Sequence, residues 1–360
     1  MSLDKFFNQS LSRWMDGTGS ENTVVISSRM RLARNLGDYP FPGRAEPKQL
    51  DEVVQQVRRW WNIGGLEALG SVNFMAIKEL SPSERQALVD KHLVSPALAR
   101  HQQGAVLTNQ EESVSIMINE EDHLRIQALL PGLQLDEAWR MASLVDDQFD
   151  GSFRYAWSPQ QGFLTSCPTN VGTGMRASVM LHLPGLSLTG QLGNILATVT
   201  KLGIVVRGLF GEGSEAQGNL YQISNQITLG QSEDEIIEAL NRLTLQIIGE
   251  ELKARELLKQ RDPDGLSDRV WRAYGILAHS RRISSREAME LISALRLGLD
   301  LKLIKGIPPR ILNELIVFIR PGYLQKVFDR ELQAEVRDSY RAQLIRERIK
   351  ISESGGDTNV

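Results

Sequence analysis

The pattern of apolar and polar positions along the chain changes once, near residue 230. Before that point, short apolar runs bounded by turns, as at 114–118 and 204–207, predict strands. Stretches with apolar residues at helical spacing lie between them, as at 46–61 and 136–149. From 236 to 259 the helical spacing is continuous, and further helical stretches follow. We therefore expect a domain of mixed helices and strands, followed by an all-helical domain.

Helix-start signals and a short linker help to divide the chain. The segments 81–84 (SPSE) and 232–235 (SEDE) each have the serine and the glutamate of a capping box. The segment 261–265 (RDPDG) has the composition of a linker. We predict a first domain at residues 1–258, a helical C-terminal domain at 259–351 and a disordered tail at 352–360.

Composition narrows the class of protein. The 360 residues include a single cysteine, which excludes an internal disulfide framework, and the N-terminus lacks the pattern of a signal peptide. No uninterrupted apolar run approaches the roughly 20 residues that a membrane-spanning helix needs. We therefore expect a soluble, cytoplasmic protein with no membrane partner.

Charge is distributed unevenly along the chain. The net charge is −3, yet residues 251–360 hold 21 Lys and Arg against 16 Asp and Glu, which gives them about +5 and the rest about −8. Such an excess is typical of a domain that meets an acidic or phosphorylated partner, and equally of charges dispersed over solvated helices. No stripe of basic residues typical of nucleic-acid binding is present, so we expect no direct nucleic-acid partner.

The segment 167–176 (CPTNVGTGMR) contains the only cysteine of the chain. Pro168 removes a backbone donor, and Gly172 and Gly174 allow backbone angles that other residues resist, so a shaped loop is predicted. A solitary cysteine is often only a small buried apolar residue. Beside such a loop, however, Cys167 is also a candidate for chemistry, as a nucleophile or as a thiolate that complements a positive charge.

Two glutamates are candidates for binding a cationic substrate. If the segment 120–123 (EEDH) is a strand, only Glu121 and His123 share a side, which argues against a protein metal cage there. Glu212 lies between glycines in a predicted flexible loop. If Glu121 and Glu212 face one pocket, they could hold a planar guanidinium by charge-assisted hydrogen bonds; the alternative is that both lie in solvated loops.

Five arginines are candidates for binding a polyphosphate, because each lies at the edge of a predicted strand or shaped loop. Taken singly, any of them could be an ordinary surface residue. Together they would form a phosphate site, and the chain has neither a P-loop nor the H-R-D and D-F-G motifs of protein kinases. The five residues are Arg29, Arg31, Arg125, Arg176 and Arg207.

These segments, in this order, resemble the signatures of the ATP:guanidino phosphotransferases, the phosphagen kinase family, over residues 20–230. The resemblance implies an α+β fold with an antiparallel sheet flanked by helices. It implies that the five arginines bind the phosphates of ATP together with Mg²⁺, and that no residue of the chain is a direct metal ligand. It further implies that Glu121 and Glu212 hold the substrate guanidinium while Cys167 helps to orient it. The segments are 27–31 (SSRMR), 119–126 (NEEDHLRI), 167–173 (CPTNVGT), 176–178 (RAS) and 207–212 (RGLFGE).

The chain also departs from the usual phosphagen kinase pattern. The helical N-terminal domain that precedes the first arginine pair in that family is missing, Phe210 stands where another arginine is common, and a helical extension follows residue 260. This arrangement is similar to the bacterial protein arginine kinases (McsB type), a branch of the family. The similarity implies ATP-dependent phosphorylation of arginine residues in proteins, with a C-terminal segment that binds phosphoarginine. That segment contains Arg337, Asp338 and Arg341; its alternative interpretation is a solvated helix face.

Three other functions stay open at this point. One is a small-molecule arginine kinase, and another is a cysteine-dependent guanidine hydrolase with His123 or His182 as the base. The third is an inactive domain that only binds phosphoarginine. For the preferred function, the expected partners are protein substrates presenting arginine, phosphoarginine-bearing proteins, an activator protein and a second copy of the chain in a homodimer.

Overall fold

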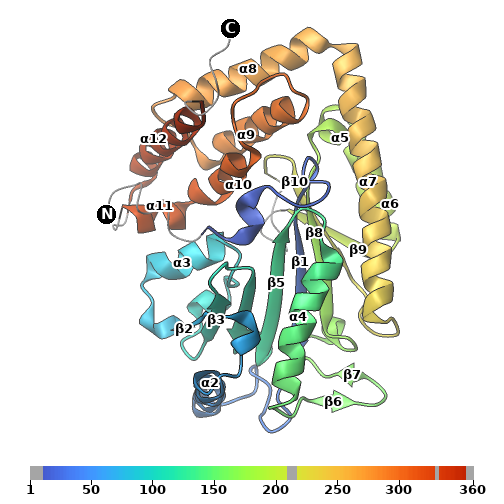
Figure 1. Cartoon of the computed structure of the whole chain (residues 1–360), viewed down its shortest axis with the longest axis vertical. Helices are drawn as coiled ribbons and strands as arrows, with labels where there is room; N and C mark the ends of the chain where they lie inside the picture. The colour runs from blue at the N-terminus through green and yellow to red at the C-terminus, as the bar shows by residue number, and fades with distance from the viewer. Residues whose placement is uncertain (1–10, 209–216, 329–331, 354–360) are drawn as a thin grey trace.

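An eight-stranded antiparallel sheet is the framework of the molecule (Figure 1). The computed structural model describes residues 11–208, 217–328 and 332–353. The strand order is β2-β3-β4-β5-β1-β8-β10-β9, and every neighbouring pair is antiparallel. The predicted α+β class with an antiparallel sheet is therefore confirmed. The strands are β1 (Val25–Arg34), β2 (Val72–Ala76), β3 (Ala105–Asn109), β4 (Val114–Ile118), β5 (Leu124–Pro131), β8 (Met175–His182), β9 (Ile204–Gly208) and β10 (Leu220–Asn225), with a separate hairpin of β6 (Trp157–Ser158) and β7 (Gly162–Phe163).

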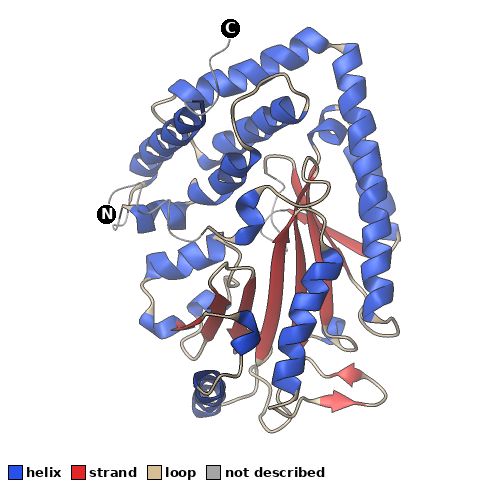
Figure 2. Ribbon diagram, viewed as in Figure 1, coloured by secondary structure: helices blue, strands red, loops and turns tan. Residues whose placement is uncertain are grey.

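Helices cover the sheet and form the C-terminal part, where Figure 2 shows only helices and loops. The capping boxes predicted at Ser81 and Ser232 are both present, with each serine oxygen accepting a hydrogen bond from the backbone N–H three residues later. The helices of the first part are α2 (Pro47–Asn62), α3 (Pro82–Asp90), α4 (Leu135–Asp150), α5 (Pro184–Leu188), α6 (Leu192–Lys201) and α7 (Glu233–Arg261). Those of the C-terminal part are α8 (Pro263–His279), α9 (Ser285–Asp300), α10 (Pro309–Phe318), α11 (Pro321–Val327) and α12 (Ala334–Glu353).

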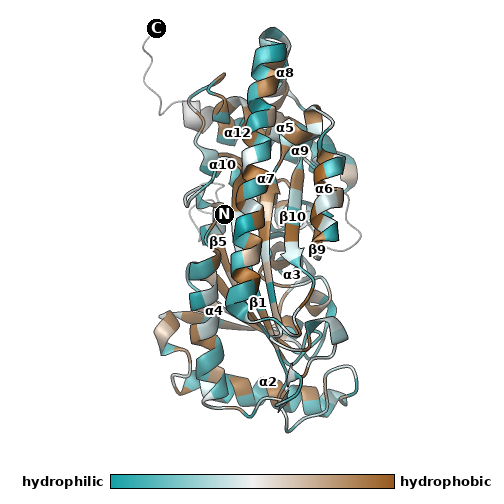
Figure 3. Ribbon diagram, turned by 90° about the vertical axis from the view of Figure 1, so that its right-hand side faces the viewer, coloured by the Kyte–Doolittle hydropathy of each residue, from teal (hydrophilic) through white to brown (hydrophobic). Residues whose placement is uncertain are grey.

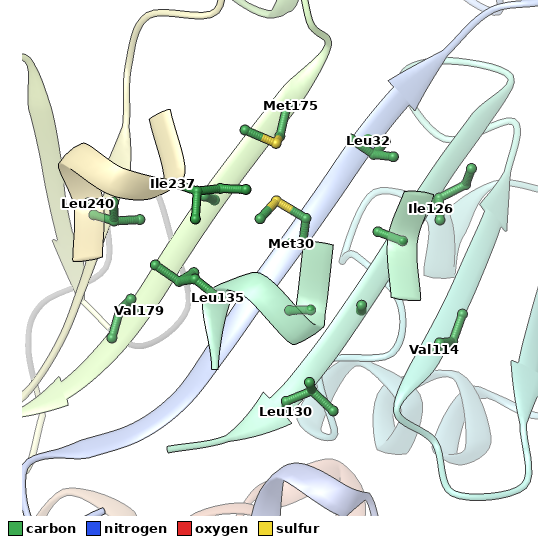
Figure 4. Packing of buried hydrophobic residues seen from close by; sticks show 14 of the residues in the cluster. Met30, Leu32, Val114, Ile126, Leu130, Leu135, Met175, Val179, Ile237 and Leu240 are labelled. Carbon is green, nitrogen blue, oxygen red and sulfur yellow. The ribbon is translucent and has the colours of Figure 1, made fainter. Parts of the chain in front are cut away.

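One face of the sheet is mainly apolar and packs against α4 and α7, and the buried Arg34 of β1 pairs there with Asp146 of α4. Met30 of β1 and Val179 of β8 point to this side, where Leu135 of α4 and Ile237 and Leu240 of α7 meet them (Figure 4). All five side chains are buried. Because side chains alternate along a strand, the residues between these apolar positions must point to the opposite face. The main core thus leaves the second face of the sheet available for a site.

A second core joins the beginning of the chain to the C-terminal helices. Trp14 and Met15, in a short 3-10 helix at Arg13–Asp16, are buried in the same cluster as Leu312 and Phe318 of α10. The side chain of Arg296 on α9 adds a hydrogen bond of 2.8 Å to the backbone oxygen of Asn22. Residues near the N-terminus therefore pack with the C-terminal part, so the two predicted domains share side-chain contacts.

Two local predictions are wrong. The segment 261–265 is not an extended linker, because α7 continues to Arg261 and α8 begins at Pro263, with Asp262 capping α8 through the backbone N–H of Gly265. The segment 119–123 is not a strand but a tight turn between β4 and β5, in which Asn119 has a left-handed backbone (φ 57°). In a turn the alternation rule no longer applies, so the argument that paired Glu121 with His123 fails.

No helix in the described part of the chain is both long enough and apolar enough to cross a membrane. The longest, α7, carries polar residues along its outer face (Figure 3).

Candidate active site

The register of the central strands places all five candidate arginines on one face of the sheet. Arg31 of β1 lies opposite Arg176 of β8, and residues directly opposite in antiparallel strands share a face. Arg29 is two residues from Arg31, and Arg125 is two residues from the partner of Arg31 on β5. Pairing through β10 brings Arg207 of β9 to the same face. This is the face opposite the apolar core, so the structure brings the predicted cluster together.

Burial, and after it the charges of neighbouring arginines, lower the pKa of the two arginines on β1. Burial and the nearby charges of Arg125, Arg176 and Arg207 lower the pKa of Arg29 to about 10. The pKa of Arg31 is lowered well below its ordinary value by burial and by the neighbouring arginines. A bound polyanion would relieve this repulsion. Clustered cations on a sheet face are therefore a feature that fits a phosphate-binding site.

Two adjacent cavities share this face. The smaller, of about 450 Å³, is lined by Glu121 and Cys167 together with four of the arginines, Arg31, Arg125, Arg176 and Arg207. The larger, of about 670 Å³, is lined by Arg29, Arg31, Arg125 and Arg207 and by apolar residues that include Val89, Val94 and Met117. Three arginines border both cavities. One cavity therefore combines acidic, thiol and cationic groups, and the other combines cationic with apolar walls.

Glu121 is held close to one of the arginines. Arg125 forms an ion pair of 2.9 Å with Glu121 and a second ion pair of 2.5 Å with Glu120. The side chain of Glu120 is almost fully buried, whereas that of Glu121 is about 44% exposed. Glu121 can therefore exchange its partner for a ligand cation more readily than Glu120 can. Sequence reasoning missed Glu120. Its ion pair with Arg125 depends on the tight turn, which brings its side chain to the start of β5.

A buried network fixes the turn at 119–123 against the cysteine loop. The Asp122 carboxylate is fully buried, and its Oδ1 accepts hydrogen bonds from the Asn35 side chain and the Ser166 backbone N–H, both at 2.6 Å. Asn35 also accepts a hydrogen bond from the backbone N–H of His123 (2.9 Å). The end of β1, the turn that carries Glu121 and the loop that carries Cys167 are thus tied at one point.

The cysteine loop has the shape that its sequence predicted. Gly172 and Gly174 both have positive φ, and a β-carbon on Gly172 would lie 2.2 Å from the backbone oxygen of Thr228. The sulfur of Cys167 is partly exposed and lies 3.0 Å from the hydroxyl of Thr169. The thiol therefore faces the smaller cavity without a histidine beside it among the residues that line that cavity.

Neither histidine proposed as a hydrolase base is placed to act on a ligand in that cavity. His123 is buried, burial lowers its pKa to about 4, and its Nδ1 accepts a hydrogen bond from the Leu36 backbone N–H. His182 is buried beside Ser293 of α9, 2.8 Å from its hydroxyl, and burial lowers its pKa well below the ordinary value. The arrangement therefore disfavours the cysteine hydrolase.

The predicted phosphoarginine-binding residues lie on α12, away from the two cavities. Arg341 is buried and donates hydrogen bonds of 2.8 Å to the backbone oxygens of Ile283 and Ile319, and it pairs with Asp338. Arg337 is half-buried and donates to the Leu332 backbone oxygen. Arg337 and Asp338 are thus accessible at the surface, whereas the Arg341 guanidinium is occupied inside the fold.

Two predicted features fall outside the described residues, namely Glu212 and Phe210. Within the described parts of the chain, no group of three or more His, Cys, Asp or Glu residues is arranged to hold a metal ion. Sequence reasoning also missed Gln222, which lines the larger cavity and accepts a hydrogen bond of 2.8 Å from Arg29. Gln222 lies directly opposite Arg207, and only the pairing of β10 with β9 reveals that the two residues share a face.

Comparisons with known proteins identify the family of the chain. The family model described as "ATP:guanido phosphotransferase, C-terminal catalytic domain" matches residues 52–254, and "Protein-arginine kinase McsB C-terminal domain" matches residues 263–359. A protein-arginine kinase of Pelotomaculum thermopropionicum is 53% identical over 348 residues, covering 96% of this chain and 98% of that protein. One of Brevibacillus brevis is 47% identical over 355 residues, covering 98% and 99%.

Among solved structures, a lombricine kinase superimposes with a TM-score of 0.56 at 25% identity, covering 68% of this chain and 72% of that one. The fold, the positions of the arginines and the two matching domains lead to the same assignment. The chain belongs to the ATP:guanido phosphotransferase family and, within it, to the protein-arginine kinases.

Proposed function

We propose that this protein transfers the γ-phosphoryl group of ATP to the guanidino group of arginine residues in proteins. The observation that carries the proposal is the convergence of the five arginines with Glu121 and Cys167 in two adjoining cavities. The relatives named protein-arginine kinase support arginine in proteins as the acceptor. His123 and His182 are buried, are hydrogen-bonded to Leu36 and Ser293, and do not line the cavity of Cys167, which supports a kinase over a guanidine hydrolase.

The arrangement of charges suggests how each substrate lies. The triphosphate of ATP would bind along the arginines that border both cavities, and the apolar walls of the larger cavity would take the base and ribose. The arginine side chain would enter the smaller cavity, between Glu121 and Cys167. Magnesium would neutralise part of the phosphate charge. Since the chain supplies no described cluster of metal ligands, we propose that the ion is held chiefly by the phosphates.

The chemical step requires positioning and a proton acceptor. A guanidinium nitrogen is a poor nucleophile while its charge is delocalised, so a carboxylate that aligns it and receives a proton assists the attack. In our proposal, Glu121 leaves Arg125 for the substrate guanidinium, and Arg125 turns to the phosphates. The nitrogen–phosphorus bond forms as the bond to the bridging oxygen of ADP breaks, and the arginines stabilise the charge that spreads over the phosphoryl group. Glu212 would be the second carboxylate, and Cys167 would orient the guanidinium as its thiolate.

The C-terminal domain would bind phosphoarginine at the surface of α12. Arg337 can approach a phosphoryl group and Asp338 a guanidino group, because both are partly exposed. The buried Arg341 would act on this site only indirectly, by holding Asp338 in place. The remaining expectations, an activator protein, a homodimer and a cytoplasmic location, are kept as proposals.

The test is mass spectrometry of an unrelated, arginine-containing protein after incubation with Mg-ATP, under conditions that preserve acid-labile phosphate. We expect phosphorylation on arginine, and free arginine should be a much poorer acceptor. Glu121→Gln keeps the shape of the side chain but removes the proton acceptor, so it should lower kcat by about 100-fold or more, with ATP binding nearly unchanged. Turnover of free arginine alone, or arginine consumption without ATP, would contradict the proposal.

A further inference from the structure

Three large apolar side chains are exposed close together beside the sheet edge. Leu202 is 65% exposed, Ile227 is 51% exposed and Leu229 is 55% exposed. The backbone N–H of Gln226 donates to the Gly203 oxygen, and a β-carbon on Gly203 would lie 3.7 Å from the end of the Ile227 side chain. The segments 202–203 and 226–227 are therefore in contact, and Leu229 follows two residues later, beside Gly172 of the cysteine loop. We call Leu202, Ile227 and Leu229 the apolar strip.

The apolar strip is attached directly to the wall of the smaller cavity. Thr228, between Ile227 and Leu229, donates hydrogen bonds to the backbone oxygens of Thr169 (2.9 Å) and Val171 (2.7 Å) in the cysteine loop. Thr169 lines the cavity, and so does Gln226, the residue before Ile227. The strip is thus an outward continuation of the cavity rim and not a separate surface.

The edge strand β9 forms the part of the cavity wall that adjoins this rim. β9 is the outermost strand of the described sheet, and it pairs only with β10 among the described strands. Its residues Val205 and Arg207 line the smaller cavity. Figure 3 shows β9 and α6 at this outer edge of the molecule. A peptide whose arginine enters the cavity can therefore place its neighbouring residues across this part of the rim, over Gln226 and the apolar strip.

We propose that the apolar strip binds the residues of the protein substrate that flank the target arginine, and that it favours an extended segment with an apolar side chain near that arginine. This inference rests on the proposed function and names the kind of acceptor segment the same site selects. Exposed apolar side chains next to a ligand cavity are typical of an interaction surface, because covering them with a partner removes apolar surface from water. An extended segment fits because β9 is the outermost strand of the described sheet, and extended peptides commonly bind along an exposed sheet edge.

The test compares substrates of two lengths on one set of variants. The long acceptor is a ten-residue peptide with one central arginine flanked by leucines; the short acceptor is N-acetyl-arginine-amide, which reaches the cavity but not the strip. The test variant is the triple substitution Leu202→Ser, Ile227→Ser and Leu229→Ser. The control is Leu245→Ser, which removes a similarly exposed leucine (52%) from α7, where it lines neither cavity.

The triple variant should raise KM for the long peptide by about five- to tenfold and change kcat/KM for the short acceptor by less than about twofold. Replacing the leucines of the peptide by serine should have the same effect on the native enzyme, and the control variant should have none. These residues are exposed, and unchanged thermal melting would establish that the triple variant folds.

Three results would overturn the inference. They are an unchanged KM for the long peptide, an equal loss on both acceptors, and a shift of the oligomeric state of the triple variant in sedimentation, which would show that a second copy covers the strip. If the native enzyme phosphorylated neither acceptor, the proposed function itself would be wrong, and this outcome differs from all three.

Discussion

Asp122 should determine how well the two halves of the guanidinium site are aligned. In Asp122→Ala, the Asn35 side chain and the Ser166 backbone N–H each lose an acceptor at 2.6 Å in a fully buried position. An unsatisfied buried donor costs about 1–3 kcal/mol. Asn35 is buried, whereas Ser166 is exposed and its N–H can bind water instead, so the loss in the free energy of unfolding should be about 1–3 kcal/mol. In Asp122→Asn the Oδ1 acceptor remains, and the amide nitrogen takes the place of Oδ2, so about 1 kcal/mol should be lost.

Urea unfolding followed by tryptophan fluorescence measures the first effect, and steady-state kinetics measures the second. Because Asp122 connects the turn of Glu121 to the loop of Cys167, Asp122→Ala should lower kcat by about tenfold or more through misplacement of these groups. KM for ATP should change little, since the arginines are fixed by strands β1, β8 and β9. An Asp122→Ala variant with the native urea midpoint and the native kcat would refute this reasoning.

Two further predictions concern the C-terminal part and the residue of α3 that contacts it. Arg341→Ala leaves the buried backbone oxygens of two residues without their donor and should lower the free energy of unfolding by about 3 kcal/mol; native-like melting of this variant would contradict the prediction. Arg337→Ala should lower the free energy of unfolding by less than about 1 kcal/mol and yet weaken phosphoarginine binding measured by calorimetry. Burial raises the pKa of Asp90 to about 6 from an ordinary 3.8, although Gln86 and Tyr323 oppose the shift. The folded protein therefore keeps a proton that the unfolded chain has released, and its stability falls as pH rises from about 4 to about 6. Asp90→Asn should remove about 2–3 kcal/mol of this pH dependence, measured as the difference in urea midpoints between pH 4 and 7; equal pH profiles would contradict it.

The arginine face was predictable in part because strand alternation is a local rule. The spacing of Arg29 and Arg31 shows from sequence alone that both point to one side. What the sequence could not show is which residues of other strands lie opposite them, because register depends on packing between distant segments. The pairing of Arg31 with Arg176, 145 positions along the chain, is of this kind. The resemblance to phosphagen kinases, not periodicity, supplied that part of the prediction.

The supporting network around Glu121 could not be predicted for the same reason, and the local prediction there was wrong. The segment 119–123 consists mostly of Asn, Asp and Glu, which are depleted in strands, and Asn119 adopts the left-handed conformation of a turn. Once the turn forms, Asp122 points inward to Asn35 and Ser166, which are 87 and 44 positions away. The chemistry of Glu121 thus depends on contacts that no local pattern encodes.

The two cavities differ in what supports them, and this difference connects the C-terminal domain to the site. The smaller cavity is built from the sheet and from loops tied to it, whereas a wall of the larger cavity consists of residues 89–100, directly after α3. α3 packs on α11: Asp90 accepts a hydrogen bond of 3.0 Å from the Tyr323 backbone N–H, and a β-carbon on Gly322 would lie 2.2 Å from the Gln86 side chain. Such close contact allows little independent movement of α3. The position of that wall, and with it the space that we propose for the nucleotide, is therefore set partly by the C-terminal helices, so a change in α11 should act on the larger cavity before it acts on Glu121 or Cys167.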